Sequence, residues 1–185
     1  MYKSYLTSRN TTAVLKCFKD SYFRYSPIDE SNIQYPEFTY DIYKQQLIFC
    51  GGGYSNYGHT SVNYCFRYVF INGNFTFPLY EILYSMTFPR QHFGLEFING
   101  FHYAFGGFYE ESSYGIHNSY FRSDCEKFKI VNWNHWEEFP VFSAPESIGY
   151  MCTVEIRNSE VYIIGGKTDT GNMCISNCVF PAPRT

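Results

Sequence analysis

The sequence predicts an all-β protein built from a repeated antiparallel unit, and three observations lead to this expectation. Aromatic residues make up 22% of the 185 residues, and Phe and Tyr favour strands over helices. No stretch of the chain keeps the 3.6-residue period of an amphipathic helix. The third observation is a run of apolar residues that ends in a glycine pair and occurs three times, at Leu47–Gly52, His102–Gly107 and Val161–Gly166.

The stretch 93–107 shows the unit most clearly. Alternation places Phe93, Leu95 and Phe97 on one face of a strand. Asn99-Gly100 predicts a tight hairpin turn, because both central residues of a type I′ turn need positive φ. The second strand, His102–Phe105, carries apolar or aromatic groups on both faces, as a strand covered on both sides does. A glycine pair then suits a sharp or crowded exit from that strand.

The first glycines of the pairs stand at 51, 106 and 165, so the period is 55 and then 59 residues, in the range of repeat proteins. Three apolar positions before each pair also recur, and so does one acidic residue at the same offset. The acids are Asp41, Glu96 and Glu155.

Taken in order, residues 1–12 are polar and are expected to be flexible. Two strands, Ala13–Lys19 and Tyr22–Tyr25, then form a partial unit over 13–27, and Ile28–Tyr35 links it to the first full unit. That unit runs over 36–84, with Asn72-Gly73 turning its third strand into its fourth.

The second full unit runs over 89–142. A polar loop is expected at Phe108–Asn118, a third strand within Tyr120–Val131, and a fourth from Trp136 to Val141. The last, partial unit runs over 149–180 and ends with a strand at Met173–Phe180.

From about Ala13 to Phe180 this pattern resembles the kelch repeat family. The family's marks are a glycine pair closing the second strand, an aromatic residue, a Trp opening the fourth strand, and Pro-Arg before the next repeat. Gly106-Gly107, Phe128, Trp136 and Pro89-Arg90 fill these roles in the second unit. The first unit has Phe75 or Tyr80 in place of Trp, and the third has Ile148-Gly149 in place of Pro-Arg.

The resemblance implies a segment of a kelch-type β-propeller made of four-stranded antiparallel blades, with two full blades and a partial blade at each end. Because propellers need about four or more blades to close, we expect an open arc that self-associates if the ring is incomplete. The expected structural residues are the glycine pairs Gly51, Gly52, Gly106, Gly107, Gly165 and Gly166, with Trp136 and the acids Asp41, Glu96 and Glu155.

Charge and hydropathy exclude several classes of partner. The net charge is −3 and Lys and Arg do not cluster, so a nucleic-acid backbone is not an expected partner. The chain shows no apolar run long enough to cross a bilayer and no signal-peptide core, so we expect no membrane partner and a cytoplasmic location.

The seven cysteines are an odd number without Cys-x-x-Cys spacing. The pattern favours free, buried thiols over a zinc site, and no metal is expected.

Two interpretations of the acids stay open. Three carboxylates at one level of a propeller channel could hold a cation or act as acid and base, or they could accept backbone hydrogen bonds once per blade. Recurrence in every unit favours the structural role.

The five histidines fit no catalytic motif. Some kelch-related propellers are copper oxidases that use Tyr, His and a Tyr–Cys link, but no spacing here selects such residues. We therefore expect no enzyme and no cofactor, and interpret the chain as a non-catalytic protein-interaction scaffold or adaptor. A glycan-binding propeller is the other alternative.

The resemblance implies that a protein partner docks on residues just after the glycine pairs and just before the first strands. These candidates are Tyr54, Phe108, Tyr109 and Lys167 after the pairs, and Arg90, Gln91 and Tyr150 before the strands. An alternative is that Phe108 and Tyr109 only cover the mouth of the channel.

Overall fold

The structure is a computed structural model that describes residues 33–34, 37–41, 46–54, 60–71, 74–113, 116–129, 135–139, 147–157, 160–171 and 176–179. Every regular element among these residues is a β-strand, and none of them belongs to a helix that could cross a membrane. The partial unit expected over 13–27 and residues 1–12, which were expected to be flexible, lie outside the described residues.

Three antiparallel sheets follow one another along the chain, and within each the strands lie in sequence order. The first sheet consists of β2 (Glu37–Asp41), β3 (Gln46–Cys50), β6 (Cys65–Ile71) and β7 (Asn74–Leu83). The second consists of β8 (Gly94–Ile98), β9 (Phe101–Phe105), β12 (Cys125–Phe128) and β13 (Glu137–Glu138). The third consists of β14 (Cys152–Arg157), β15 (Glu160–Ile164) and β16 (Ser176–Val179).

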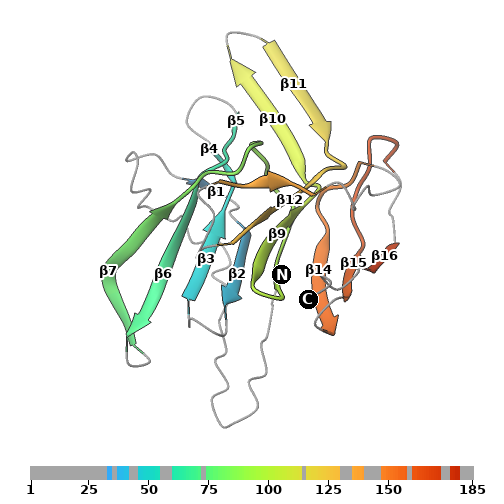
Figure 1. The fold of residues 1–185 in the computed structure, drawn as a ribbon. Helices are drawn as coiled ribbons and strands as arrows, with labels where there is room; N and C mark the ends of the chain where they lie inside the picture. The colour runs from blue at the N-terminus through green and yellow to red at the C-terminus, as the bar shows by residue number, and fades with distance from the viewer. Residues whose placement is uncertain are drawn as a thin grey trace.

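The sheets are arranged as neighbouring blades of a β-propeller segment (Figure 1). The first strand of the second sheet, β8, lies beside the first strands of the other two, β2 and β14. We call the sheets the first, second and third blade. The predicted fold class, with four strands in each of the two full blades, is confirmed.

Two smaller sheets differ from the expected loops. The polar segment after Gly107 forms a two-stranded ribbon, β10 (Phe108–Ser113) with β11 (Ile116–Phe121), which projects beyond the blades (Figure 1). The polar residues of this segment predict a loop. A ribbon outside the core can nevertheless be polar, because strand pairing satisfies the hydrogen-bonding groups of its backbone. β1 (Ile33–Gln34), within the expected linker, pairs with β4 (Gly53–Tyr54), which also pairs with β5 (Thr60–Ser61).

The glycine pairs close the second strand of each blade, as predicted. All six glycines have positive φ, and so do Asn99 and Gly100 in the predicted hairpin turn. The pairs also join blades: Gly52 N–H donates to Arg90 O at 3.0 Å, and Gly107 N–H donates to Ile148 O at 2.7 Å. A Cβ on Gly106 would lie only 2.6 Å from Ile148 O, so a side chain there would push the next blade away.

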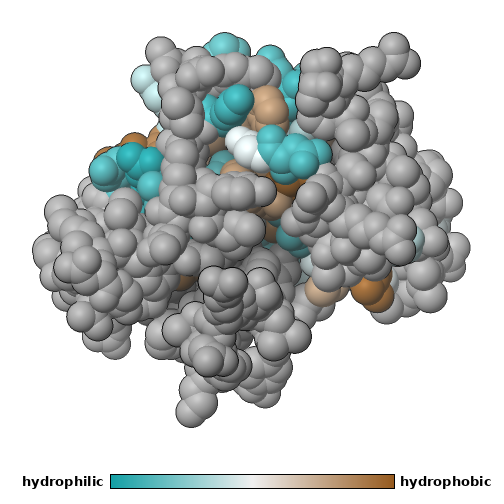
Figure 2. All heavy atoms as spheres, turned by 60° about the horizontal axis from the view of Figure 1, so that its bottom comes forward, coloured by the Kyte–Doolittle hydropathy of each residue, from teal (hydrophilic) through white to brown (hydrophobic). Residues whose placement is uncertain are grey.

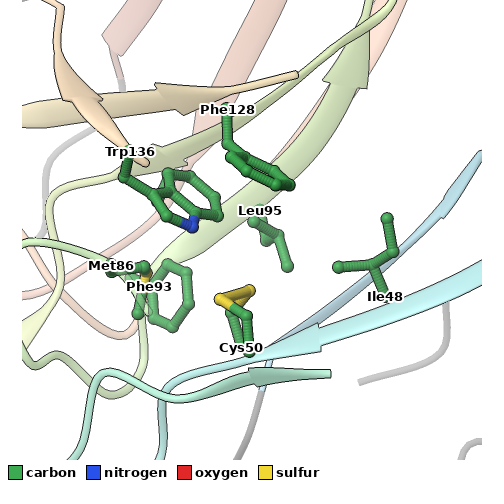
Figure 3. Packing of buried hydrophobic residues seen from close by; sticks show 9 residues of the cluster. Ile48, Cys50, Met86, Phe93, Leu95, Phe128 and Trp136 are labelled. Carbon is green, nitrogen blue, oxygen red and sulfur yellow. A yellow bond between two sulfur atoms is a disulfide. The ribbon is translucent and has the colours of Figure 1, made fainter. Parts of the chain in front are cut away.

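The first junction is an apolar core between the first and second blades (Figure 3). Ile48 and Cys50 from the first blade meet Leu95, Ala104 and Phe128 from the second. Trp136 directly precedes β13 and is buried in this core. Its ring stacks on Phe128, and its Nε1 donates a hydrogen bond to Tyr84 O at 3.0 Å. The predicted position of Trp136, at the start of a fourth strand and against a neighbouring blade, is confirmed.

Cys50 and Cys65 form a disulfide within this core, so the expectation of free thiols is wrong for these two residues. The cause is register, because β3 and β6 pair with Cys50 directly opposite Cys65. Their separation of 15 residues in sequence does not reveal that pairing.

The second junction lies between the second and third blades. Tyr103, Phe105 and Cys125 pack against Ile148, Met151 and residues of β15. Gly94 stands so close to the Thr153 side chain that no larger residue fits between these blades.

Candidate functional site

The segments expected to carry the binding residues do come together. The residue after each glycine pair is bridged to the segment before the first strand of its own blade: Gln34 with Gly53, Gln91 with Phe108, and Gly149 with Lys167. We call the end of the blades where these bridges and the β10–β11 ribbon lie the ribbon end.

Aromatic rings from three segments gather at the ribbon end. Across the ribbon, Phe108 lies opposite Phe121 with ring centroids 5.1 Å apart, and Tyr109 lies opposite Tyr120 at 5.0 Å. Tyr150, before β14, adds its ring at 5.9 Å from Phe108. We call His92, Phe108, Tyr109, Tyr120, Phe121 and Tyr150 the aromatic surface.

His92 and Tyr150 occupy matching positions before the first strands of two successive blades. Both have left-handed backbones, with φ of 51° and 55°, which is uncommon for residues other than glycine. Their rings stack at 4.2 Å, and Tyr150 N–H donates to His92 O at 2.8 Å. Burial lowers the pKa of His92 to about 4, so the imidazole is neutral near pH 7. Non-glycine residues in this conformation often mark functional sites.

The ribbon is held in place and carries negative charge. Glu110 N–H donates to Ser61 Oγ at 2.9 Å, which ties β10 to β5 of the small β1–β4–β5 sheet. The Tyr109 hydroxyl donates to Glu111 at 2.7 Å, and this hydrogen bond, with a smaller contribution from desolvation, raises the pKa of Tyr109 to about 12. The Arg122 guanidinium lies over the Phe88 ring at 4.2 Å and also approaches Tyr120. The surface therefore offers aromatic faces beside acidic and basic groups.

The predicted contact residues differ in their exposure to solvent. Tyr150 and Lys167 are exposed, and Phe108 and Tyr109 are partly buried in the aromatic surface. The backbone of Tyr54 lies in β4, and its side chain is outside the described residues. Arg90 and Gln91 are buried, so neither presents its side chain to solvent, and we correct their assignment to a docking surface.

Arg90, in the segment between the first two blades, instead anchors that segment to the second blade from inside. Its guanidinium is 0% exposed and donates to Glu126, to Asp124 at 2.6 Å and to Gly106 O at 2.7 Å. Glu126 is also fully buried and accepts from the backbone N–H groups of Thr87 and Phe88. Burial alone would raise the pKa of Asp124, but Arg90 and Arg122 outweigh it and hold that pKa below its ordinary value of 3.8. A buried cation with this many acceptors is an architectural group.

The three acids do not share one level. Asp41 pairs with Gln46, Glu96 with Tyr103 and Glu155 with Val161, which stand at different distances from their glycine pairs. The hairpin formed by the first two strands has a turn of different length in each blade. Acids at the same sequence distance from their glycine pairs therefore lie at different levels in the structure. Glu96 is buried, and the side chains of Asp41 and Glu155 are outside the described residues.

Within the described residues no three His, Cys, Asp or Glu side chains are grouped so that they could hold a metal ion.

Sequence reasoning did not single out His92, Tyr120 or Phe121. Tyr120 and Phe121 belong to the segment interpreted as the third strand, and only the ribbon register places them opposite Tyr109 and Phe108. The sequence did contain a signal for a turn here, because Tyr114-Gly115 stands between two runs that each contain aromatic residues.

Neither a known protein family nor a curated protein matches the sequence. Among solved structures, the chain is similar to that of YjhT, a kelch-like propeller, with a TM-score of 0.64 and 12% identity. The match covers 80% of this chain and 42% of that one, so this chain spans less than half the length of the structure it matches. At this identity the likeness shows the fold alone.

Proposed function

We propose that the chain is a kelch-repeat protein and that its blades serve as a non-catalytic protein-interaction module. The glycine pairs, the stacked Phe128 and Trp136, and Pro89-Arg90 at the first junction support membership of the kelch family. Each of these residues has a structural task at a blade junction or at the end of a strand, which is what a repeat signature requires.

The observation that carries the function is the aromatic surface at the ribbon end. Tyr120 and Tyr150 are exposed, large and partly held by ring stacking, so little side-chain entropy is lost when a partner covers them. Aromatic residues with an Arg close by are the usual centre of a protein–protein hot spot. Surface connections on a rigid scaffold are also the usual place for binding residues.

The proposed contact set is therefore revised by the structure. It keeps Phe108, Tyr109, Tyr150 and Lys167 and adds Tyr120, whereas Arg90 and Gln91 support the surface from below. Gln91 does this through its bridge to Phe108 and a 3.3 Å hydrogen bond to Glu110.

The test is quantitative capture of partners by the full chain and by a Tyr120→Ala, Tyr150→Ala double variant. We expect capture to fall at least about tenfold, because removal of two hot-spot rings costs about 2 kcal/mol or more. Tyr84→Ala is the matched control, since Tyr84 is similarly exposed but lies outside the aromatic surface. Circular dichroism confirms that all variants are folded.

Unchanged capture by the folded double variant would overturn this site. An array of free glycans provides the second arm. Glycan binding by the purified chain that is lost in the double variant would favour the sugar-binding alternative, since tyrosine rings can also stack on sugars.

A further inference from the structure

The β10–β11 ribbon has an inner edge that the chain itself fills and an outer edge that the described chain leaves open. The inner strand, β10, lies beside β5, whereas β11 pairs with no described strand other than β10. Figure 1 shows β11 on the outer side of the projecting ribbon. A strand with an open edge presents N–H and C=O groups to any extended segment that reaches it.

The inner edge shows in which direction the backbone groups point. Phe108 exchanges two hydrogen bonds with Gln91, at 2.7 and 2.9 Å. Two residues further along β10, Glu110 N–H donates to Ser61 Oγ. Because backbone groups of an antiparallel pair alternate in direction, the groups of Phe108 and Glu110 point away from β11. The chain therefore supplies the partners on this edge.

The outer edge has the same alternation. Phe121 N–H donates to Asp169 Oδ1 at 3.3 Å and so points away from β10. The N–H and C=O groups of Ser119 and His117, two and four residues before it on β11, then point the same way. Both residues are exposed, and no group of the described chain bonds to these outward backbone groups. Two successive pairing positions are therefore open.

Hydropathy does not distinguish this edge from the rest of the surface. Figure 2 turns the end opposite the ribbon toward the viewer, and it shows hydrophilic and hydrophobic atoms of described residues close together on the surface. What distinguishes β11 is its open backbone edge. Such an edge is matched by the backbone of another extended strand, which offers the complementary N–H and C=O groups at the same spacing.

We propose that the outer edge of β11 binds a short, basic, extended segment of the protein partner as an antiparallel third strand of the ribbon. This inference rests on the proposed function and names the kind of segment that the module takes up. The segment's residues opposite Ser119 and His117 each exchange two backbone hydrogen bonds with β11. The residue opposite Tyr120 lies against that ring, which is 45% exposed, so the added strand continues the aromatic surface.

The basic character of the segment follows from the charges of the ribbon. The stretch Phe108–Phe121 contains Glu110 and Glu111 and no Lys or Arg. Glu110 lies directly across from Ser119, so it shares a face with the segment's residue opposite Ser119, about 10 Å away between Cα atoms. Ser119 is small, and a Lys or Arg side chain can therefore extend over it to the Glu110 carboxylate, which is partly exposed.

The test is an NMR titration of the full chain with the blocked peptide acetyl-Tyr-Arg-Thr-Val-amide, whose arginine is designed to lie opposite Ser119. We expect saturable shifts of the backbone amide signals of Ser119 and His117. N-methylation of the arginine should weaken binding at least about tenfold, because it removes a donor and places a methyl group at the pairing edge. N-methylation of the threonine is the matched control and should be tolerated, because that N–H points away from β11.

Two variants test the same contacts from the side of the protein. Ser119→Pro removes an outward N–H without removing a bond to β10, and it should weaken peptide binding at least about tenfold. Glu110→Gln should weaken binding of the arginine peptide about two- to fivefold and leave a peptide with glutamine in place of arginine unaffected. Glu138→Gln is the matched control, since Glu138 is exposed on β13 and lies outside the ribbon.

If Ser119→Pro does not fold, the two methylated peptides still decide with the wild-type chain. Missing shifts at Ser119 and His117, or equal weakening by both N-methyl groups, would rule out strand addition at β11. Equal binding of the arginine and glutamine peptides would rule out a basic segment.

The proposed function fails or stands on a separate measurement. If the Tyr120, Tyr150 double variant loses partner capture but the peptide does not bind at β11, only the present inference falls. If the peptide binds at β11 but the double variant captures partners like the wild type, the aromatic surface falls and the strand edge stands.

Discussion

At the scale of single residues, Arg90 shows how far burial changes the meaning of a side chain. In the sequence Arg90 lies close to aromatic residues, and this combination of residue types is typical of a binding hot spot. In the structure it is the cation of a buried network that includes Glu126, Asp124 and Gly106 O. Removing it would leave Glu126 charged and buried at the first junction.

We therefore expect Arg90→Met to lower the free energy of unfolding by about 3–5 kcal/mol in urea titrations. The double variant Arg90→Met, Glu126→Gln should recover part of that loss, because it removes the uncompensated carboxylate. A loss below about 1 kcal/mol for the single variant would contradict the buried network.

His92 makes the folding stability of the chain depend on pH. Its pKa is about 4 in the folded state against 6.5 ordinarily, so the unfolded chain binds a proton first as the pH falls. Its contribution to stability is complete above about pH 6.5 and is lost progressively toward pH 4. The Asp124 carboxylate, whose pKa lies below 3.8, changes the folding stability only at lower pH.

The expected result is a melting temperature that falls between pH 7 and pH 4, and falls less in His92→Asn. Asparagine suits the control because it tolerates the left-handed backbone at this position and does not titrate. Identical pH profiles for the two proteins would show that His92 is not the acid-sensitive group.

At the scale of elements, the junctions between blades carry the stability of the structure. Trp136 spans one junction, with its ring in the apolar core and its Nε1 bonded to Tyr84 O on the chain that leaves the first blade. The disulfide in the same core holds β3 to β6. Disulfides are typical of proteins in oxidising compartments and rare in the cytoplasm, which is the location expected from the sequence.

Trp136→Ala should reduce the free energy of unfolding by about 3–5 kcal/mol, as expected for loss of a buried indole. Trp136→Phe should cost less, because it keeps a ring against Phe128 and loses only the hydrogen bond and part of the volume. Chemical denaturation measures both. Equal values for the two variants would mean that the ring stacking contributes nothing.

At the scale of the whole molecule, the described blades form part of a propeller, and the match covers only 42% of the solved structure that they resemble. The ribbon end lies apart from both junction cores, so the Tyr120, Tyr150 double variant is expected to lose partner capture while it keeps the cooperative unfolding of the wild type.

The blade strands around the glycine pairs, the Asn99-Gly100 turn and the repeat could be predicted from the sequence alone. Alternation, Asn99-Gly100 and the glycine pairs act over a few residues, so their consequences could be predicted from neighbours in the chain. The position of Trp136 could also be predicted, because the resemblance to kelch repeats implies a Trp at the start of a fourth strand.

Several contacts between residues far apart in the sequence became clear only from the three-dimensional arrangement. The Cys50–Cys65 disulfide, the burial of Arg90, the unequal levels of the acids and the ribbon pairing of Phe108 with Phe121 all depend on register between strands. A shift of one or two residues in a turn changes register without altering the local pattern. The exposure of Ile164 depends on whether another blade lies beside β15, and no residue near it in sequence carries that information.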